Sequence, residues 1–216
     1  MTSVVIAVPF WNTNAGTKSF SSMYDESWVE KLYRGIKRHC TVPFEFVCFT
    51  ERERVFSEPI AVERFTNSEP SYADCLEPYR LGRPMMLMGL DTVITGNIDH
   101  LARYCLEADK LAVPRDPFFP QTVCNGVALV PAGHDWVWDE WPANAHRFTA
   151  YSKDMDWIRS INPAVIDDIW PGSVVSYKGH AKTEGVEGVS IVYFHGEEKM
   201  NDDCVGKIEW VKKNWF

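Results

Sequence analysis

The sequence of 216 residues lacks the features that mark several classes of protein. No apolar run approaches the length that crosses a bilayer, and no basic stretch followed by an apolar one stands near its start. The six cysteines include no C-x-x-C pair, which indicates reduced thiols and argues against a zinc site. The formal net charge of -8 argues against nucleic-acid binding, which needs basic surface to neutralise phosphates. We therefore expect a cytoplasmic protein without a nucleic-acid partner.

The chain also lacks repeats, low-complexity segments and a Pro/Gly/Ser-rich linker, so residues 1–216 are expected to form a single domain. Hydrophobic residues make up 45% and charged residues 24%, as in ordinary globular proteins. Aromatic residues reach 13%, with nine Trp. Such side chains line pockets for sugars or bases, and they also build ordinary cores.

Apolar, β-branched runs alternate with stretches of helical periodicity. Residues 4–10 (VVIAVPF) predict a buried strand, residues 27–40 a helix started by a capping box of Ser27 and Glu30, and residues 44–51 a second strand. Further strands are predicted at 60–65, 85–90, 110–114, 125–132, 173–180 and 189–196, and a short aromatic helix at 134–141, ending or kinking near Pro142. This alternation predicts an α/β fold with a mixed, mostly parallel sheet and helices on both faces.

Polar residues stand where the apolar strands begin or end. In an open α/β sheet, ligands bind outside the carboxyl ends of the strands. The candidates are Pro9, Phe10, Trp11 and Asn12 after the first strand, Asp91 after the central one, Asn125 at the entry to the 125–132 strand, His195 and Gly196 after the last strand, and Lys199 beyond it. If these positions converge, they form one site with a carboxylate, an imidazole, an amide and an ammonium group.

Four of these candidates suit a phosphate-bearing ligand. Asp91 and His195 are residue types that ligate a divalent ion such as Mn²⁺, which would bridge a diphosphate and offset its charge. Gly196 lets the backbone approach a ligand closely, and Lys199 supplies a point charge for phosphate. Structural explanations stand beside these: Asp91 as a turn cap, His195 as a hydrogen-bonded histidine and Lys199 as a solvated surface residue.

Two other segments carry candidate binding residues. Asp154 and Asp156 lie beside Trp157, a combination that suits sugar recognition, although acidic residues are also favoured at a helix start. The segment 207–216 (KIEWVKKNWF) mixes aromatic and basic residues. It is interpreted either as a final helix packed on the domain or as a weak contact with a membrane surface.

Taken in order, several segments resemble a family of small bacterial GT-A glycosyltransferase-like proteins related to the family 8 retaining glycosyltransferases. They are 32–51, 89–101 (GLDTVITGNIDHL), 124–130 (CNGVALV), 153–158 (KDMDWI), 174–180 (VVSYKGH) and 191–199 (IVYFHGEEK). The resemblance implies a single-domain GT-A, Rossmann-like fold. It also implies transfer of a hexose from a nucleotide diphosphate sugar, with UDP as the expected nucleotide, to a glycan or other hydroxyl acceptor with retention of configuration.

The same resemblance implies roles for the candidate residues. Asp91, as the second aspartate of Asp-x-Asp, and His195 would hold Mn²⁺ or Mg²⁺, and Lys199, with Gly196 beside it, would contact the donor diphosphate. Asn125, Asp154 and Asp156 would line the sugar and acceptor region as the catalytic candidates, and residues 9–12 would border the base and ribose.

The sequence departs from the family pattern at the metal motif, where Gly89 replaces the first aspartate. Further departures are Lys153, Met155 and Met200. Three possibilities stay open: a metal held by Asp91, His195 and water; a metal-independent site with Lys199 or an arginine supplying the charge; or a degenerate domain that binds nucleotide or glycan without turnover. A nucleotidyltransferase is disfavoured because residues 9–18 lack the Gly-rich, basic loop that cradles a triphosphate.

Overall fold

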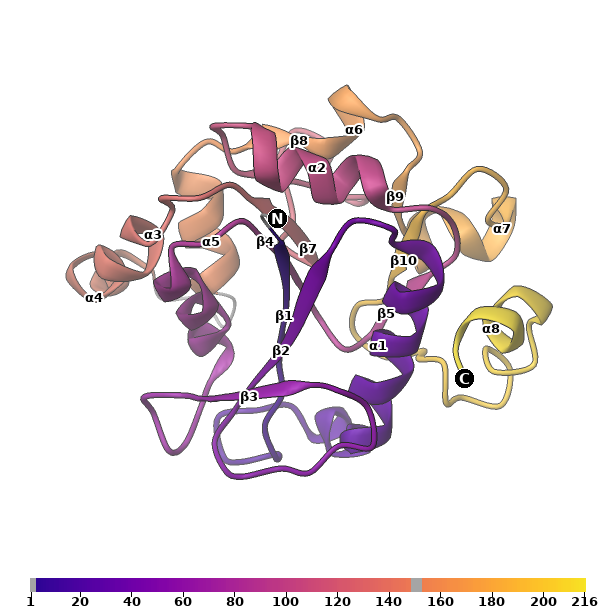
Figure 1. The fold of residues 1–216 in the computed structure, drawn as a ribbon, viewed down its shortest axis with the longest axis horizontal. Coiled ribbons are helices and arrows are strands. Elements are labelled where there is room, and N and C mark those ends of the chain that lie inside the picture. The colour runs from indigo at the N-terminus through magenta and orange to yellow at the C-terminus, as the bar shows by residue number, and fades with distance from the viewer. Residues whose placement is uncertain (1–2, 149–152) are drawn as a thin grey trace.

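The computed structural model describes residues 3–148 and 153–216, which form two sheets (Figure 1). The larger sheet has the order β3-β2-β1-β4-β7-β6-β8 and the smaller one the order β5-β10-β9. The strands of the larger sheet are β1 (Val4–Pro9), β2 (Phe44–Thr50), β3 (Ala61–Arg64), β4 (Met85–Met88), β6 (Ala112–Val113), β7 (Val127–Val130) and β8 (Ala164–Val165). Those of the smaller sheet are β5 (Thr92–Ile94), β9 (Val174–Ser176) and β10 (Ile191–Tyr193).

The larger sheet is mixed and mostly parallel, which confirms the predicted fold class. Strand β1 pairs in parallel with β2 and β4, β2 with β3, and β6 with β8. Strand β7 is antiparallel to both of its neighbours, β4 and β6. The carboxyl ends of β1, β2 and β4 therefore meet at one edge, where the amino end of β7 also lies.

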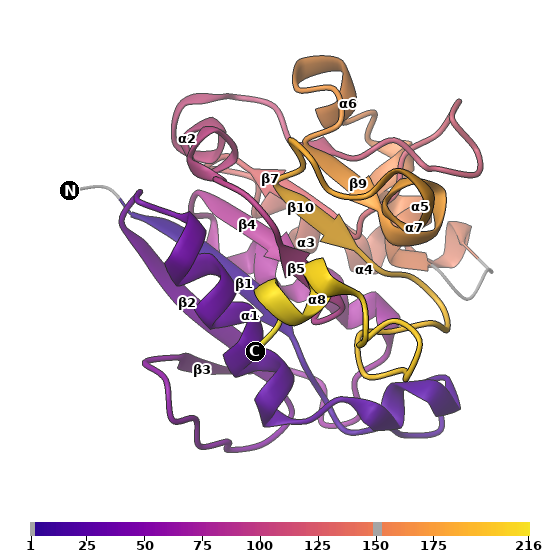
Figure 2. The same ribbon diagram turned by 90° about the vertical axis from the view of Figure 1, so that its right-hand side faces the viewer.

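Helices cover both faces of the larger sheet because its central strands are apolar on both sides (Figures 1 and 2). In β1, Val4, Ile6 and Val8 pack with one hydrophobic cluster, and Val5 and Ala7 with another. The first cluster includes α1 (Glu26–His39) and α2 (Asp99–Glu107), and the second η2 (Tyr72–Leu81), α3 (Trp136–Asp139), α4 (Trp141–Asn144) and α5 (Lys153–Ser160). Full burial of each valine or isoleucine side chain contributes about 1.5–3 kcal/mol.

The smaller sheet packs on the same side as α1. Gly35 of α1 faces the Ile94 side chain of β5, and a Cβ added there would lie 3.4 Å from it, in van der Waals contact. The remaining elements are short and peripheral. They are η1 (Ser19–Met23), η3 (Ala145–Arg147), α6 (Ile166–Ile169), η4 (Tyr177–Ala181), α7 (Lys182–Glu184) and α8 (Glu209–Asn214).

The C-terminal segment docks on α1 (Figure 2). Arg34 donates to the Phe216 carbonyl at 2.8 Å, Arg38 donates to the Asn214 carbonyl at 2.5 Å, and the Lys31 ammonium lies 3.7 Å from the Trp215 ring centre. These contacts agree with a final helix packed on the domain, and the membrane-surface contact stays a prediction. Of the helices in residues 3–148 and 153–216, none combines the length and apolar character needed to cross a bilayer.

Some local predictions are wrong. The cap of α1 is Asp25, which accepts from the Ser27 amide at 3.0 Å, whereas the Glu30 carboxylate accepts from Ser57 instead of closing a capping box. By contrast, the aromatic helix does end near Pro142 as predicted, since α3 stops at Asp139 and a separate helix, α4, begins at Trp141. Pro142 lies in the first turn of α4, where the missing N–H leaves no hydrogen bond unmade.

Candidate active site

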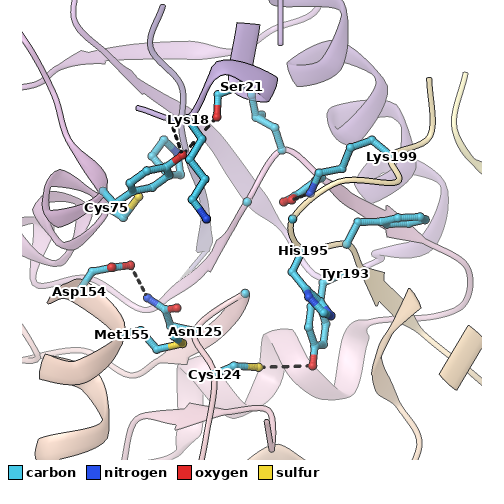
Figure 3. Close-up of a pocket in the computed structure, with 18 of the residues that line it drawn as sticks. Lys18, Ser21, Cys75, Cys124, Asn125, Asp154, Met155, Tyr193, His195 and Lys199 are labelled. Carbon is cyan, nitrogen blue, oxygen red and sulfur yellow. Dashed lines mark hydrogen bonds and ion pairs between the residues drawn. The ribbon is translucent and has the colours of Figure 1, made fainter. Parts of the chain in front are cut away.

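A cavity of about 430 Å³ opens at the edge of the sheet where β1 and β4 end and β7 begins (Figure 3). Of the predicted residues, Pro9, Phe10, Trp11, Asp91, Asn125, Asp154, His195, Gly196 and Lys199 line it. Sequence reasoning thus found residues that the fold brings together from five separate segments. Asn12 and Asp156 lie outside the cavity lining.

Two opposite sides of the cavity carry most of the polar residues that the sequence predicted (Figure 3). The α5 wall consists of Asn125, Asp154 and Met155, and the β10 wall consists of His195, Gly196 and Lys199. Gly196 takes φ = 64°, which makes the turn that leads the chain from His195 towards Lys199. Glycine adopts that conformation without the steric cost of a side chain.

An ion pair joins the β10 wall to the loop after β4. Lys199 is only 1% exposed, and its ammonium group is ion-paired with the Asp91 carboxylate. A hydrogen bond links Tyr24 to the same carboxylate, and the pKa of Tyr24 is raised first by burial and then by the charge of Asp91. Asp91 is therefore held by two partners at the edge of the cavity.

His195 is half-buried beside this ion pair. Its Nε2 lies 2.8 Å from the Ser176 hydroxyl, within hydrogen-bond distance, and the Phe118 ring packs edge-on against it at 5.2 Å. Burial lowers the pKa of His195, and the charges of Lys178 and Lys199 lower it further. The imidazole is consequently favoured in its neutral form.

The α5 wall holds a buried carboxyl group. Asp154 is 8% exposed and accepts a hydrogen bond of 2.7 Å from the Asn125 side-chain amide. Burial raises the pKa of Asp154, and the hydrogen bond from Asn125 opposes that shift. Asp156 lies two residues along α5, on another face of the helix, and pairs with Arg159 at 3.3 Å.

The end of β1 forms the cavity wall beyond these polar groups. The Phe10 ring is 2% exposed and has the Arg54 guanidinium 3.8 Å from its centre. Trp11 packs edge-on against Tyr72 with ring centres 6.0 Å apart. Asn12 turns away and accepts from Arg54 at 2.9 Å, which explains why it does not line the cavity.

Sequence reasoning missed a second group of lining residues. They are Lys18, Ser21 and Tyr24 from the segment after β1, Tyr72 and Cys75 from η2, Asp116, Pro117, Phe118 and Cys124 from the loop before β7, and Tyr193 from β10. Figure 3 shows Lys18 extending into the space between the two walls. The available signal was the run of polar residues after β1, at the binding edge of the sheet.

The residues predicted to ligate a metal do not fit a divalent cation in this arrangement. Among the described residues, no group of three or more His, Cys, Asp or Glu side chains is placed to hold a metal ion. The Asp91 carboxylate is ion-paired with Lys199, His195 is bonded to Ser176, and Gly89 offers no ligand. Mg²⁺ needs near-octahedral oxygen ligation. Binding of Mn²⁺ or Mg²⁺ by Asp91 and His195, which the sequence predicted, would require both side chains to leave these partners.

Comparison with known proteins identifies the fold. No family model and no curated protein matches the chain. The fold is similar to that of the glycosyltransferase GlyE of Streptococcus pneumoniae TIGR4, with a TM-score of 0.62 and 12% identity over 99% of this chain and 63% of GlyE. The apo form of GlyE gives 0.61 and 10%, over 98% and 63%.

A second similar structure is the galactosyltransferase LgtC, solved in complex with donor and acceptor sugar analogs. It gives a TM-score of 0.59 and 8% identity over 97% of this chain and 93% of LgtC. At such low identity these likenesses show the fold, which is of the GT-A type. The chain spans only 63% of the length of GlyE, and its relation to family 8 remains a resemblance.

Proposed function

We propose that this protein is a glycosyltransferase that moves a hexose from a nucleotide diphosphate sugar, with UDP as the nucleotide, to a glycan or other hydroxyl acceptor. The observation that carries the proposal is the division of one cavity into a β10 wall with a buried ammonium and an α5 wall with a buried carboxyl group. The GT-A fold, and the glycosyltransferases that share it, support the same activity.

The proposed donor lies across the cavity between the two walls. Pro9, Phe10 and Trp11 border the base and ribose, because aromatic side chains offer flat apolar surface to a ring. Lys199 faces the diphosphate, and the open backbone at Gly196 lets a phosphate approach closely. Asp154, oriented by Asn125, accepts hydrogen bonds from hydroxyl groups of the donor sugar.

In the proposed transfer, the bond between the anomeric carbon and the β-phosphate oxygen breaks, and its electron pair stays on the diphosphate. The acceptor hydroxyl oxygen forms the new bond to the same carbon, and its proton passes to the departing phosphate oxygen. The resemblance to retaining enzymes supports retention of configuration. The protein contributes by positioning the reactants and by stabilising charge on the leaving group.

A nucleotide-binding protein without turnover is the second candidate. Gly89 favours it, since the loss of one carboxylate from the metal motif is what a degenerate site would show. Both candidates bind UDP, and only the enzyme breaks the sugar–phosphate bond.

Two measurements test the proposal. The first is calorimetric titration with UDP. The second incubates the protein with a panel of UDP-hexoses and scores UDP release, with and without glycan acceptors, and the products are analysed by NMR for anomeric configuration. UDP binding with release of UDP is the expected result. Binding without release across the panel would favour the second candidate, and no binding would exclude both.

A further inference from the structure

The positive charge of the β10 wall comes from a buried lysine side chain, Lys199. Lys199 is among the largest fully buried side chains, and both it and its partner Asp91 line the cavity. Removing an ammonium group from water is costly unless an opposite charge and hydrogen bonds compensate. Lys199 is therefore fixed in place by Asp91. The lysine's own backbone N–H is also bonded, to the Asp202 carboxylate at 2.7 Å.

Gly89 is part of the same arrangement. A Cβ added at this position would lie 2.6 Å from Oδ1 of Asp91. The Asp91 carboxylate thus occupies room that any side chain at position 89 would need. A side chain at position 89 would therefore require the Asp91 carboxylate to move away from its present position, whereas the φ of Gly89 lies outside the left-handed region and imposes no constraint of its own.

The formal charges also agree with a change of cation. In the Asp-x-Asp motif that the sequence resembles, two carboxylates balance a divalent ion. Here one carboxylate, Asp91, balances one ammonium, Lys199. Loss of the carboxylate at position 89 is consistent with a site whose resident cation carries a single charge.

We propose that the Lys199 ammonium takes the place of a divalent metal ion and binds the diphosphate of the nucleotide, which then leaves without metal assistance. This inference rests on the proposed function. Lys199 contacts the leaving group, whereas Asp91 is a positioning residue that holds Lys199 through the ion pair. A fixed cation stabilises developing charge without reorganising during the reaction.

The experiment compares UDP affinity in EDTA with that in MnCl₂ by calorimetry, for the intact chain and three variants. The unmodified protein is expected to bind UDP equally well in both buffers, within about twofold. Lys199→Met should lose at least about tenfold in both, as removal of a charged hydrogen-bond donor does. Asp91→Asn should bind UDP with the same affinity in EDTA and in MnCl₂, but more weakly than the unmodified protein, because the lysine remains without the carboxylate that positions it. Lys182→Met is the matched control, since Lys182 pairs with Glu198 at 2.9 Å on the exposed surface.

The outcomes separate this inference from the proposed function. UDP binding only in MnCl₂, with loss on Asp91→Asn, would overturn the inference and leave the glycosyltransferase proposal standing. Absence of UDP binding in every buffer would remove the proposed function itself. Thermal unfolding checks that Lys199→Met folds. If it does not, the comparison of the unmodified protein in EDTA and MnCl₂ still decides the question.

Discussion

The two walls of the cavity satisfy their buried charges in different ways. In the β10 wall, the Lys199 ammonium has an opposite charge, Asp91, as its partner. In the α5 wall, Asp154 has the neutral amide of Asn125, and the pKa of Asp154 is raised by burial. In the β10 wall the positive charge is balanced by a negative one, whereas in the α5 wall the carboxyl group lies in surroundings that disfavour its charged form.

This difference indicates which wall gains more free energy when hydrogen-bond donors of a ligand bind to it. A buried carboxylate loses the hydrogen bonds that water would give it. Hydroxyl groups of the donor sugar can replace those hydrogen bonds and so stabilise the charged form. Strained or destabilised groups of this kind concentrate at functional sites, where stability is lowered in favour of activity. This difference agrees with the proposed assignment of the α5 wall to the sugar and of the β10 wall to the diphosphate.

The largest predicted effect is on turnover, and it comes from replacing the buried carboxyl group of the α5 wall. Asp154→Asn should lower turnover of a UDP-hexose roughly 10–100-fold, because hydrogen bonds to a charged acceptor are lost while the shape is kept. UDP affinity should stay within about twofold, since the proposed diphosphate subsite lies on the other wall. Steady-state UDP release and calorimetry measure the two effects.

Asp156→Asn is the matched control for this variant. Asp156 is the neighbouring acid on α5, but it pairs with Arg159 outside the cavity lining. Its replacement should change turnover by no more than about twofold. Equal losses in the two variants would contradict the assignment of Asp154 to the sugar.

The next prediction concerns a second carboxylate introduced beside the Lys199–Asp91 ion pair of the β10 wall. Gly89→Asp should weaken UDP binding in EDTA about tenfold, because the new side chain displaces Asp91 and adds negative charge beside Lys199. Mn²⁺ should restore part of that affinity. Gly89→Ala separates the causes, since it adds the steric conflict without the charge. Unchanged binding by Gly89→Asp in EDTA would show that the ion pair does not govern nucleotide affinity.

A third prediction concerns the stability of the α5 wall. Burial raises the pKa of Asp154 in the folded chain above the ordinary value of an aspartate. Its contribution to folding is therefore fully present below the unfolded pKa and is lost as pH rises through the folded one. Asp154→Asn should raise the unfolding midpoint at pH 7.5 by roughly 2–4 °C, about 1 kcal/mol for a chain of this size.

Thermal unfolding across a pH series tests this sign. The advantage of Asp154→Asn should shrink as the buffer is acidified towards pH 4, because the carboxyl group of the unmodified protein then takes up its proton. An advantage that grows on acidification would mean that Asp154 is stabilised as a carboxylate, against the dominance of burial. Asp156→Asn, whose charge is paired, should show no such gain at pH 7.5.

The sequence predicts the sheet better than it predicts the site. Strands such as β1 and β4 follow from short apolar runs, because burial on both faces leaves no room for polar residues. The end of β4 leads to Asp91, and the end of β10 in the smaller sheet leads to His195. By contrast, β5 and β8 were not predicted. They are only three and two residues long, too short for a periodic pattern to distinguish them from a loop.

Contacts between distant segments account for the rest of what was missed. The pairing of Lys199 with Asp91 spans 108 positions, and nothing local in either segment predicts it. Tyr24 and Tyr72 reach the cavity from irregular and 3₁₀ segments, which have no apolar periodicity to follow. The difference between Asp154 and Asp156, however, was accessible from sequence, because residues two apart on a helix point to different faces.

The smallest predicted effect concerns the acceptor side, at the mouth between the walls. Phe118 is 55% exposed, lines the cavity and packs against His195, and its amide is held by the Asp116 carboxylate at 2.9 Å. Arg159 fixes Asp116 in turn at 2.8 Å, so the ring is presented on an ordered loop.

Phe118→Ala should raise the KM for a glycan acceptor about threefold, the scale of one aromatic contact. Acceptor-independent release of UDP should be unaffected, and Phe119→Ala, at an equally exposed position outside the cavity lining, should change neither quantity. An equal change in acceptor KM for both variants would show that the loop acts through its general apolar character and not through the ring that faces the cavity.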